Sequence, residues 1–458
     1  MRVRTHGGAA GARARAASIA LASVFAAAEA PGALAAQPTD RRPVGRGERT
    51  PVVLVAIDGL KPEYVRRADS LGLRIPTLRR LAREGASATG VIGVSPTVTY
   101  PSHATLVTGV APARHGILAN TTFDPLLRNQ QGWYWYAEDL RAPTLWDAAA
   151  ARGLTSGAVH WPVSVGARLT WNVPQIWRTG TPDDRKLLRA LATPGLVDAL
   201  EARVGAPYAD GIDESIAGDE RRARFVARLI ETRRPALTLG YLTALDHEQH
   251  EHGPWSPQAF AVLERVDAAL DTIVAAARRT YGARVTIAVA SDHGFAATHT
   301  EVHLGAALAA AGLVTVAPDG ERPAQWDAMP WPAGGSVAVM VRNGAGPAAV
   351  ARVDSVVRAL ASDTANGVAH LLDRDALARD GAWTGARWVL AFRPGWRVGY
   401  RLAGPLRTAV RGGTHGYARG EPQMRASFLI AGPAIAPATD LGTIDMRDVA
   451  PTLAARLG

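Results

Sequence analysis

Residues 51–59, PVVLVAIDG, decide the fold class, because they form an unbroken apolar run that ends in Asp58 and a glycine. Such a run is typical of a parallel strand that is buried on both faces of a sheet. An aspartate directly after this strand would lie at the carboxyl edge of the sheet, where ligands bind in open α/β folds. We therefore interpret this segment as the first strand of an α/β domain.

Similar apolar runs recur along the chain and alternate with segments of helical periodicity. They are ATGVIGV (88–94), SGAVHW (156–161), ALTLGYLT (236–243), RVTIAVA (284–290) and ASFLIAG (426–432). This alternation predicts a three-layer α/β sandwich with a mainly parallel central sheet and helices on both sides. The region 301–410 alternates less regularly, so we expect a helix there and a smaller inserted lobe around 315–410.

The composition restricts the possible classes of protein. The 458 residues are 47% hydrophobic and 20% charged, as in an ordinary globular protein. The net charge of +10 comes from scattered arginines, so we expect no stable nucleic-acid partner. Cysteine is absent, which excludes disulfides, thiolate metal sites and cysteine nucleophiles.

The N-terminus has the pattern of a secretory signal peptide. Several arginines precede a short apolar run, and small residues follow at Ala33, Ala35 and Ala36. We expect residues 1–36 to be a signal peptide cleaved near Ala35 or Ala36, 37–49 a linker, and 50–458 the catalytic domain. The apolar run is too short to span a membrane, so we expect a periplasmic or secreted protein without a transmembrane segment in its mature form.

Polar side chains gather just after the predicted strands. Asp58 ends the first strand, and Thr99 follows the second at the entrance of a helix. DHEQHEHGP, with Asp246 and His250, follows the strand at 236–243, and SDHG, with Asp292 and His293, follows the strand at 284–290. GGTHGY, with His415, precedes the last strand. We therefore expect these side chains to meet at one edge of the sheet.

Aspartate and histidine in this arrangement favour zinc, which binds carboxylate oxygen and imidazole nitrogen. Asp246 and His250 are four residues apart and share one side of a helical turn, so with His415 they can complete one site. A second set of side chains can bind another ion: Asp58, Asp292 and His293, with the hydroxyl of Thr99. Two zinc ions can clamp the attacking and leaving oxygens of a phosphoryl displacement.

Two interpretations of Thr99 remain open at this stage. Alone, a threonine at the start of a helix is more often an N-cap than a nucleophile. Beside a zinc ion, however, its hydroxyl can lose its proton near neutral pH. The N-terminus of the following helix would also attract a phosphate.

Five separated motifs appear in the order found in the nucleotide pyrophosphatase/phosphodiesterases of the alkaline phosphatase superfamily, which the chain resembles. They are VVLVAIDG, SPTVTYPSHATLVTGVAPARHGILAN, DHEQHEHGP, SDHG and GTHGY. The resemblance extends from about residue 50 to the C-terminus and implies an alkaline phosphatase-like fold with two Zn²⁺ ions. It implies Thr99 as the nucleophile, with Asp58, Asp292 and His293 on the nearer zinc and Asp246, His250 and His415 on the other. It also implies that Asn120 holds a phosphoryl oxygen.

The sequence motifs indicate the type of reaction more closely than they indicate the substrate and its leaving group. Threonine-based phosphomonoesterases of the superfamily use a Lys-x-Arg pair, and neither Lys61 nor Lys186 belongs to one. We therefore expect a small-molecule phosphodiester or nucleotide substrate that is cleaved through a phosphothreonine on Thr99. A phosphomonoesterase or a phosphonoacetate hydrolase is the alternative on the same site, and a non-catalytic phosphoester-binding protein is the alternative of another class.

Aromatic residues are candidates for contact with the substrate. By resemblance, Tyr100 is expected beside the leaving group and Tyr208 against a base. The cluster WYWYAEDL (133–140) either lines the pocket or belongs to the core, and packing is the commoner role for such a cluster.

Overall fold

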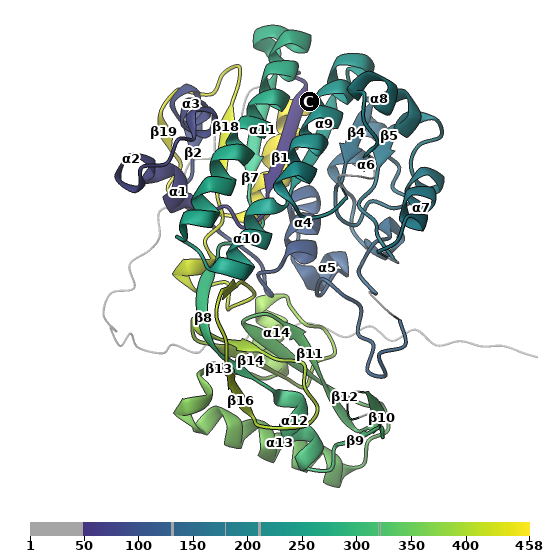
Figure 1. Ribbon diagram of the computed structural model, residues 1–458, viewed down its shortest axis with the longest axis vertical. Coiled ribbons are helices and arrows are strands. Elements are labelled where there is room, and N and C mark those ends of the chain that lie inside the picture. Colours follow the sequence, from purple (N-terminus) through teal and green to yellow (C-terminus); the bar gives the residue numbers. More distant parts are fainter. Residues whose placement is uncertain (1–48, 130–131, 179, 209–211, 319, 321) are drawn as a thin grey trace, which may run out of the picture. The chain divides into compact units, whose positions relative to one another are not determined.

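The computed structural model describes residues 49–129, 132–178, 180–208, 212–318, 320 and 322–458, and these described residues belong to one compact unit (Figure 1). The predicted signal peptide, and the linker up to residue 48, lie outside the described residues. The division of the chain into these domains therefore stays a prediction. Within the described part, no helix has both the length and the apolar character that a membrane crossing requires.

An eight-stranded sheet forms the centre of the fold, in the order β19-β2-β18-β7-β1-β6-β4-β5. Its strands are β1 (Val52–Ile57), β2 (Ala86–Ser87), β4 (Ser156–Val159), β5 (Trp171–Val173), β6 (Leu237–Leu242), β7 (Thr286–Ala290), β18 (Phe428–Ala431) and β19 (Thr439–Asp440). The five neighbours β7, β1, β6, β4 and β5 are all parallel. This confirms the predicted α/β class with a mainly parallel sheet.

Helices cover both faces of this sheet, and the alternation of side chains along β1 explains why. Val53, Val55 and Ile57 enter one hydrophobic core, while Val52 and Leu54 enter the other. The first core is covered by α3 (Pro76–Glu84), α8 (Leu196–Val204), α9 (Ile216–Arg233) and α11 (Pro257–Tyr281). The second is covered by α4 (Thr99–Thr108), α6 (Leu145–Ala151) and α15 (Val449–Leu457). A continuous apolar strand is needed because both of its faces are buried.

Two of the predicted strands differ from the structure. The run 88–94 is expected in the parallel sheet, but β3 (Gly90–Ile92) pairs with β20 (Thr443–Asp445) in a separate two-stranded sheet, and Val91 adds one isolated bridge to Ala426. The strand that enters the central sheet here is β2, immediately before it, which lies between β18 and β19. The run 426–432 does enter the central sheet, but β18 is antiparallel to β7.

Residues 296–414 build a second group of strands, drawn below the central sheet in Figure 1. The strands β11 (Ala328–Ala333), β12 (Ser336–Val341), β14 (Trp388–Phe392) and β13 (Val368–Leu372) form a four-stranded antiparallel sheet. Helices α12 (Leu304–Ala310) and α13 (Pro347–Ser362) share a hydrophobic core with it, and α14 (Arg374–Asp380) follows β13. A smaller sheet joins β8 (Ala296–Val302) to β15 (Gly395–Val398), β16 (Arg407–Ala409) and β17 (Gly413–Thr414), and β9 (Val314–Val316) pairs with β10 (Pro323–Trp326).

The remaining α-helices have nine residues or fewer. They are α1 (Pro62–Arg66), α2 (Ala68–Leu71), α5 (Pro112–His115), α7 (Asp183–Leu191) and α10 (Ala244–His252). Among them α10 matters most for function, because it starts just after β6 at the carboxyl edge of the central sheet.

Candidate active site

Three adjacent parallel strands bring the three predicted carboxylates together. Asp58 follows β1, Asp292 follows β7, and Asp246 lies in the first turn of α10 after β6. Because β7, β1 and β6 are neighbours with the same direction, their carboxyl ends lie side by side. The position of each aspartate after its strand is therefore enough to gather the three carboxylates at one point.

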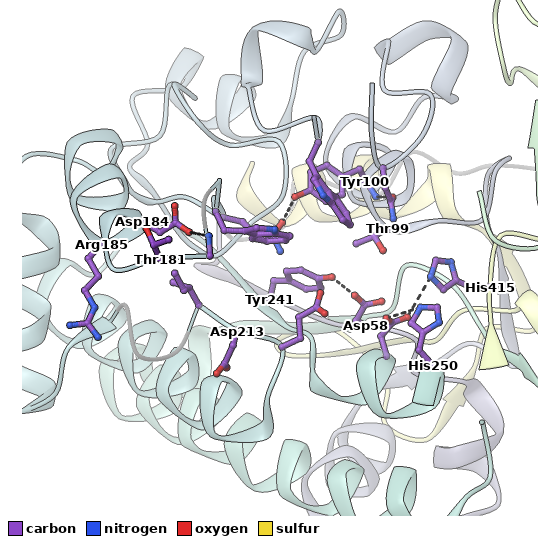
Figure 2. A pocket seen from close by; sticks show the side chains of 18 of the residues that line it. Asp58, Thr99, Tyr100, Thr181, Asp184, Arg185, Asp213, Tyr241, His250 and His415 are labelled. Carbon is purple, nitrogen blue, oxygen red and sulfur yellow. Dashed lines mark hydrogen bonds and ion pairs between the residues drawn. The ribbon is translucent and has the colours of Figure 1, made fainter. Parts of the chain in front are cut away.

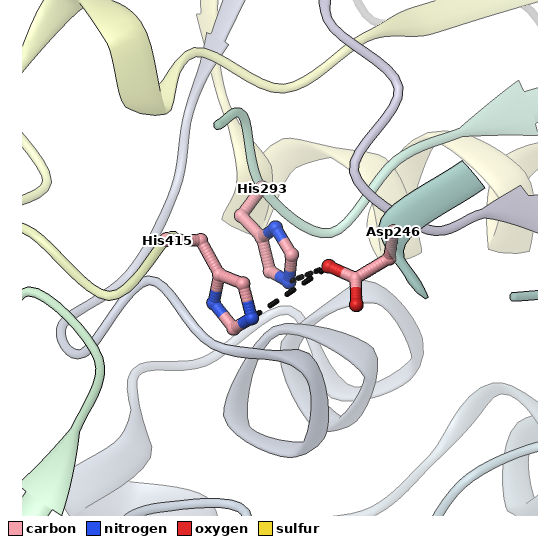
Figure 3. A group of neighbouring side chains, drawn as sticks. All are labelled: Asp246, His293 and His415. Atoms are coloured by element: carbon pink, nitrogen blue, oxygen red, sulfur yellow. Dashed lines mark ion pairs between the residues drawn. The ribbon is translucent and has the colours of Figure 1, made fainter. Parts of the chain in front are cut away.

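Histidine nitrogens complete two groups of metal-binding type, and His293 belongs to both. One group is Asp58, Asp292 and His293, and the other is Asp246, His293 and His415. The Nε2 atom of His293 lies 3.4 Å from Asp58 Oδ1, 3.2 Å from Asp292 Oδ2 and 4.0 Å from Asp246 Oδ1. Figure 3 shows Nε2 of His293 and Nε2 of His415 facing the same oxygen of Asp246.

His250 is placed close to the second group, on the other side of Asp246. Its Nε2 atom lies 3.3 Å from Asp246 Oδ2, while Nε2 of His415 lies 3.6 Å from Asp246 Oδ1. Two ligand atoms bound to the same tetrahedral zinc ion, each at about 2.1 Å, lie roughly 3.4 Å apart. The separations around Asp246 and His293 are therefore those of side chains that can share a cation.

Backbone carbonyls fix the tautomers of the three histidines. Nδ1 of His250 lies 3.1 Å from the carbonyl oxygen of Gly413, and Nδ1 of His293 lies 3.1 Å from that of Gly294. Nδ1 of His415 lies 3.1 Å from the carbonyl oxygen of Thr97. A carbonyl can only accept, so Nδ1 carries the hydrogen and, in the neutral ring, the lone pair of Nε2 faces the carboxylates.

Burial shifts the pKa values of the histidines and aspartates in this cluster. It lowers the pKa of His415 to about 4 and that of His293 well below its ordinary value, so both rings are neutral at pH 7. Burial also raises the pKa of Asp292 to about 7, and burial together with the charges of Asp246 and Asp292 raises the pKa of Asp58. Without a cation beside them, Asp58 and Asp292 therefore resist ionisation, while the nitrogen lone pairs of His293 and His415 are kept away from water.

Three carboxylate oxygens in the cluster have no hydrogen-bond partner although they are buried. They are Asp58 Oδ1, Asp246 Oδ1 and Asp292 Oδ2. The companion oxygens of Asp58 and Asp292 are held, since Tyr241 donates its hydroxyl to Asp58 Oδ2 and the Gly59 N–H donates to Asp292 Oδ1 at 3.2 Å. Buried acceptors without donors are costly, and oxygen and imidazole nitrogen suit zinc. The residues present therefore fit a divalent metal.

Thr99 begins helix α4 but does not cap it. The N-cap is Val98, and no side chain caps this end. The hydroxyl oxygen of Thr99 lies 3.5 Å from Nε2 of His293 and faces the cavity (Figure 2). The capping interpretation of this threonine is therefore wrong, and its oxygen lies beside the group of Asp58, Asp292 and His293.

Asn120 is oriented by the backbone of the same helix. The N–H of Tyr100 donates to Asn120 Oδ1 at 2.9 Å, and Asn120 lines the cavity. Because the amide oxygen is engaged, the NH₂ group is the part of this side chain that remains to donate. The structure thus places a neutral donor next to Thr99.

A cavity of about 800 Å³ opens over these residues (Figure 2). Asp58, Thr99, Asp246, His250 and His415 lie at one end, and the aromatic rings of Tyr100, Trp133 and Trp177 line a wall next to them. Tyr100 and Trp133 have ring centroids 5.2 Å apart, and Trp133 and Trp177 5.4 Å apart. Figure 2 places Arg185, with Asp184 and Thr181, at the other end of the cavity.

The aromatic candidates have different positions. Tyr100 lines the cavity, and its hydroxyl donates to Gln175 at 2.7 Å. Tyr208 is fully buried in the core against Phe225, 3.2 Å from His160, and is absent from the described cavity lining. The expectation that Tyr208 sandwiches a base is therefore corrected, because its ring has no exposed face. In the cluster 133–140, Trp133 lines the cavity while Trp135 belongs to the core.

Sequence reasoning missed several residues of this cavity, among them Tyr241, Gln175 and Trp177. Tyr241, which donates to Asp58, lies within β6 and looked like an ordinary strand residue. Gln175 and Trp177 lie in a loop after β5, a strand that is too short for its periodicity to be recognised. The only available signal was the concentration of tryptophan between residues 133 and 177.

The lysine nearest in sequence to the site does not face it. Lys61 is buried, and its Nζ donates to the carbonyl oxygens of Phe295 and Gln423, both at 2.9 Å. Arg185 is the only lysine or arginine among the described residues that line the cavity. No Lys-x-Arg pair therefore stands beside Thr99 in the part of the chain that the structure describes.

The comparisons with known proteins all point to the same protein family. The family model described as type I phosphodiesterase / nucleotide pyrophosphatase matches residues 52–418. A pyrophosphatase/phosphodiesterase of Schizosaccharomyces pombe is 27% identical over 54% of this chain and 45% of its own length. Human ectonucleotide pyrophosphatase/phosphodiesterase family member 1 is 24% identical over 54% of this chain and 24% of its own length. The chain thus matches less than half the length of these two relatives.

Solved structures extend the likeness of fold to most of the chain. Murine ectonucleotide pyrophosphatase/phosphodiesterase 5, as an inactive variant in complex with AMP, has a TM-score of 0.63 at 19% identity. The match covers 90% of this chain and 95% of that structure. The human protein of the same name has a TM-score of 0.61 at 20% identity, with the same coverage.

Proposed function

Because the chain belongs to the type I phosphodiesterase/nucleotide pyrophosphatase family, we propose that it hydrolyses phosphodiester or phosphoanhydride bonds with two zinc ions and Thr99 as nucleophile. One observation carries the proposal. Three buried carboxylate oxygens without partners face Nε2 atoms whose tautomers are fixed, and the hydroxyl of Thr99 lies 3.5 Å from one of those atoms. An N/O donor set of this kind beside a hydroxyl suits metal-assisted phosphoryl transfer.

Two sets of side chains would hold the ions. Asp58, Asp292 and His293 lie nearest Thr99, and Asp246, His250 and His415 lie on the other side of His293. When bound, the ions supply positive charge that favours the alkoxide of Thr99 and stabilises the charge developing on phosphoryl oxygens. The remaining steps follow from the side chains themselves.

In the proposed reaction, the Thr99 oxygen attacks phosphorus and the bond from phosphorus to the leaving oxygen breaks. The leaving group takes up a proton, and a phosphothreonine that keeps the second ester group on its phosphorus remains. Water then attacks this phosphorus, which releases the phosphorylated product and restores the hydroxyl of Thr99. The Asn120 NH₂ group would donate to a phosphoryl oxygen, and the N-terminal end of α4 would favour its negative charge.

The cavity supports a diester more than a monoester. A terminal phosphate carries one more negative charge than a diester, and the described residues around Thr99 offer the neutral amide of Asn120 rather than a lysine or arginine. The wall of Tyr100, Trp133 and Trp177 suits an aromatic leaving group. The AMP bound to the murine neighbour supports nucleotides as the first substrates to test.

The test compares three substrates on one preparation: an aryl phosphodiester, the matching phosphomonoester and phosphonoacetate. Zinc is titrated into chelated protein, and the Thr99→Ala variant is run beside His252→Ala, a change on the exposed side of the same helix as His250. We expect diester turnover to be fastest, to depend on zinc and to need Thr99 but not His252. Diester turnover that survives Thr99→Ala or complete removal of zinc would contradict the proposal.

We also infer that the protein is exported, from the signal-peptide pattern of residues 1–36. N-terminal sequencing of protein from the native host tests this. A mature N-terminus near Ala36 or Gln37 is expected, whereas an N-terminus at Met1 would contradict it.

A further inference from the structure

A second cavity, of about 570 Å³, shares no lining residue with the first. Three parts of the chain enclose it: the segment before Thr99, the segment after His415, and the sheet and helix around β14 and α14. Its walls include Ser95 and Pro96 from the first part, Tyr417 and Arg419 from the second, and Leu377 from α14. The cavity therefore lies behind the two segments that carry Thr99 and His415.

Arginine dominates the charge of this cavity. Arg379, Arg419 and Arg425 line it together with His370, and Asp380 is the only carboxylate in the lining. Asp380 already accepts from Arg419 Nε at 2.7 Å. Two guanidinium groups therefore remain without a carboxylate in the wall.

These two arginines lack partners in different ways. Arg379 is exposed, and the structure gives it no ion pair within the described residues. Arg425 is half-buried, and its Nη1 atom is buried without a hydrogen-bond partner. A buried N–H of a charged group without an acceptor is costly, so such groups are normally satisfied by protein, water or a ligand.

The chemistry of the wall indicates what kind of ligand the guanidinium groups of Arg379 and Arg425 would bind. Guanidinium groups match the paired oxygens of phosphate and carboxylate in a planar, bidentate geometry. The rest of the lining is largely apolar, with Leu372, Leu377 and Trp383 among its members. A ligand with an anionic end and an apolar body fits both features.

We propose that this cavity is a second binding site, which takes a small phosphate monoester with an apolar or aromatic body through Arg379 and Arg425. The site goes beyond the proposed catalytic function, because it contains none of the residues assigned to catalysis. It is nevertheless connected to the catalytic residues by short contacts. Thr97 Oγ1 donates to the carbonyl oxygen of Tyr417 at 2.8 Å, and Nδ1 of His415 lies 3.1 Å from the carbonyl oxygen of Thr97.

The experiment measures binding rather than turnover. Phenyl phosphate is titrated calorimetrically into the full-length, zinc-loaded protein, and inorganic phosphate serves as a second probe. The Arg379→Gln and Arg425→Gln variants are compared with Arg342→Gln, a control on the exposed surface of the same lobe that pairs with Asp327. Thermal unfolding of each variant shows whether it folds, and exposed Arg379 provides a change that is not expected to affect folding.

We expect one binding event to weaken at least tenfold in each of the two cavity variants and to be unchanged in Arg342→Gln. The same event should be several-fold tighter for phenyl phosphate than for inorganic phosphate. Binding at the catalytic site is a separate event, which Thr99→Ala or removal of zinc would weaken. A failure of the catalytic proposal would therefore affect that event and leave binding at the second cavity unchanged. Phenyl phosphate binding that is identical in wild type, Arg379→Gln and Arg425→Gln would overturn the site, and equal affinity for the two probes would overturn the ligand class.

Discussion

The rings of His293 and His415 stack with their centroids 3.7 Å apart and 11° between their planes, although they come from distant parts of the chain. Both Nε2 atoms face Asp246 Oδ1, which has no hydrogen-bond donor (Figure 3). Nitrogen lone pairs directed at a carboxylate oxygen repel it unless a cation lies between them. This relationship between two histidines is the strongest physical argument for a metal site.

Metal binding should therefore stabilise the fold. A ligand that binds only the native state at 100 times its Kd adds about 2.7 kcal/mol to the free energy of unfolding. We expect zinc added to chelated protein to raise the midpoint of thermal unfolding, and His415→Ala to reduce that increase. His252→Ala, on the exposed part of α10, should respond to zinc as the wild type does. An unfolding midpoint that is independent of zinc would contradict the metal site.

Replacing Asn120 tests the proposed phosphoryl contact. Loss of one donor to a developing oxyanion typically costs about 100- to 1,000-fold in kcat. We expect Asn120→Ala to lower kcat in this range for an aryl phosphodiester, while Asn343→Ala, in an exposed loop, has no effect. Steady-state kinetics measure both, and a kcat for Asn120→Ala within twofold of wild type would exclude the assigned role.

Trp177 provides a test of the aromatic wall. Its ring lies 5.4 Å from that of Trp133 and lines the cavity. Aromatic contacts contribute about 1 kcal/mol beyond burial, so Trp177→Ala should raise KM several-fold for a diester with an aryl leaving group. A diester with a methyl leaving group is the internal control and should change little. Equal changes for both substrates would mean that the ring does not contact the leaving group.

A buried histidine next to helix α4 predicts how stability depends on pH. Burial lowers the pKa of His115 to about 4, and the ring bridges Thr105 Oγ1 at 3.1 Å and the N–H of Ile117 at 3.2 Å. In the unfolded chain His115 titrates near pH 6.5, so between about pH 6.5 and 4 the unfolded state binds more protons. The neutral ring therefore stabilises the fold above this window, and the stability is lost as the pH falls.

Urea unfolding of metal-free protein at pH 7 and pH 5 measures this effect. We expect wild type to lose more stability than His115→Gln on acidification, with a difference of up to about 1 kcal/mol per pH unit. The His370→Gln variant, an exposed change, serves as the control. A pH dependence that is the same in His115→Gln and wild type would contradict the assignment.

Much of the fold follows from the sequence because central parallel strands must be apolar on both faces. The runs at 51–59, 156–161, 236–243 and 284–290 all contain strands of the central sheet. The run at 88–94 was misassigned because an apolar segment does not specify its partner, and β3 pairs instead with β20, more than 350 residues later. The antiparallel direction of β18 was hidden for the same reason.

The convergence of the site could also be expected, because Asp58, Asp246 and Asp292 each follow a strand of one sheet. Its finer chemistry could not. The contact of His293 with both groups depends on the turn after β7, and the bond from Tyr241 to Asp58 depends on two strands lying in register. Tyr208 was misplaced because an aromatic residue in a loop carries no sign of whether it enters the core.

The most direct measurement traps the proposed covalent intermediate. Zinc-loaded enzyme is mixed with excess aryl phosphodiester, quenched in acid within the first turnovers, digested and analysed by mass spectrometry. We predict a peptide whose Thr99 carries the phosphoryl group with the ester substituent that did not leave, absent without substrate and absent in Thr99→Ala. Rapid hydrolysis of the diester with no covalent phosphate on Thr99, or with the phosphate on another residue, would contradict the account.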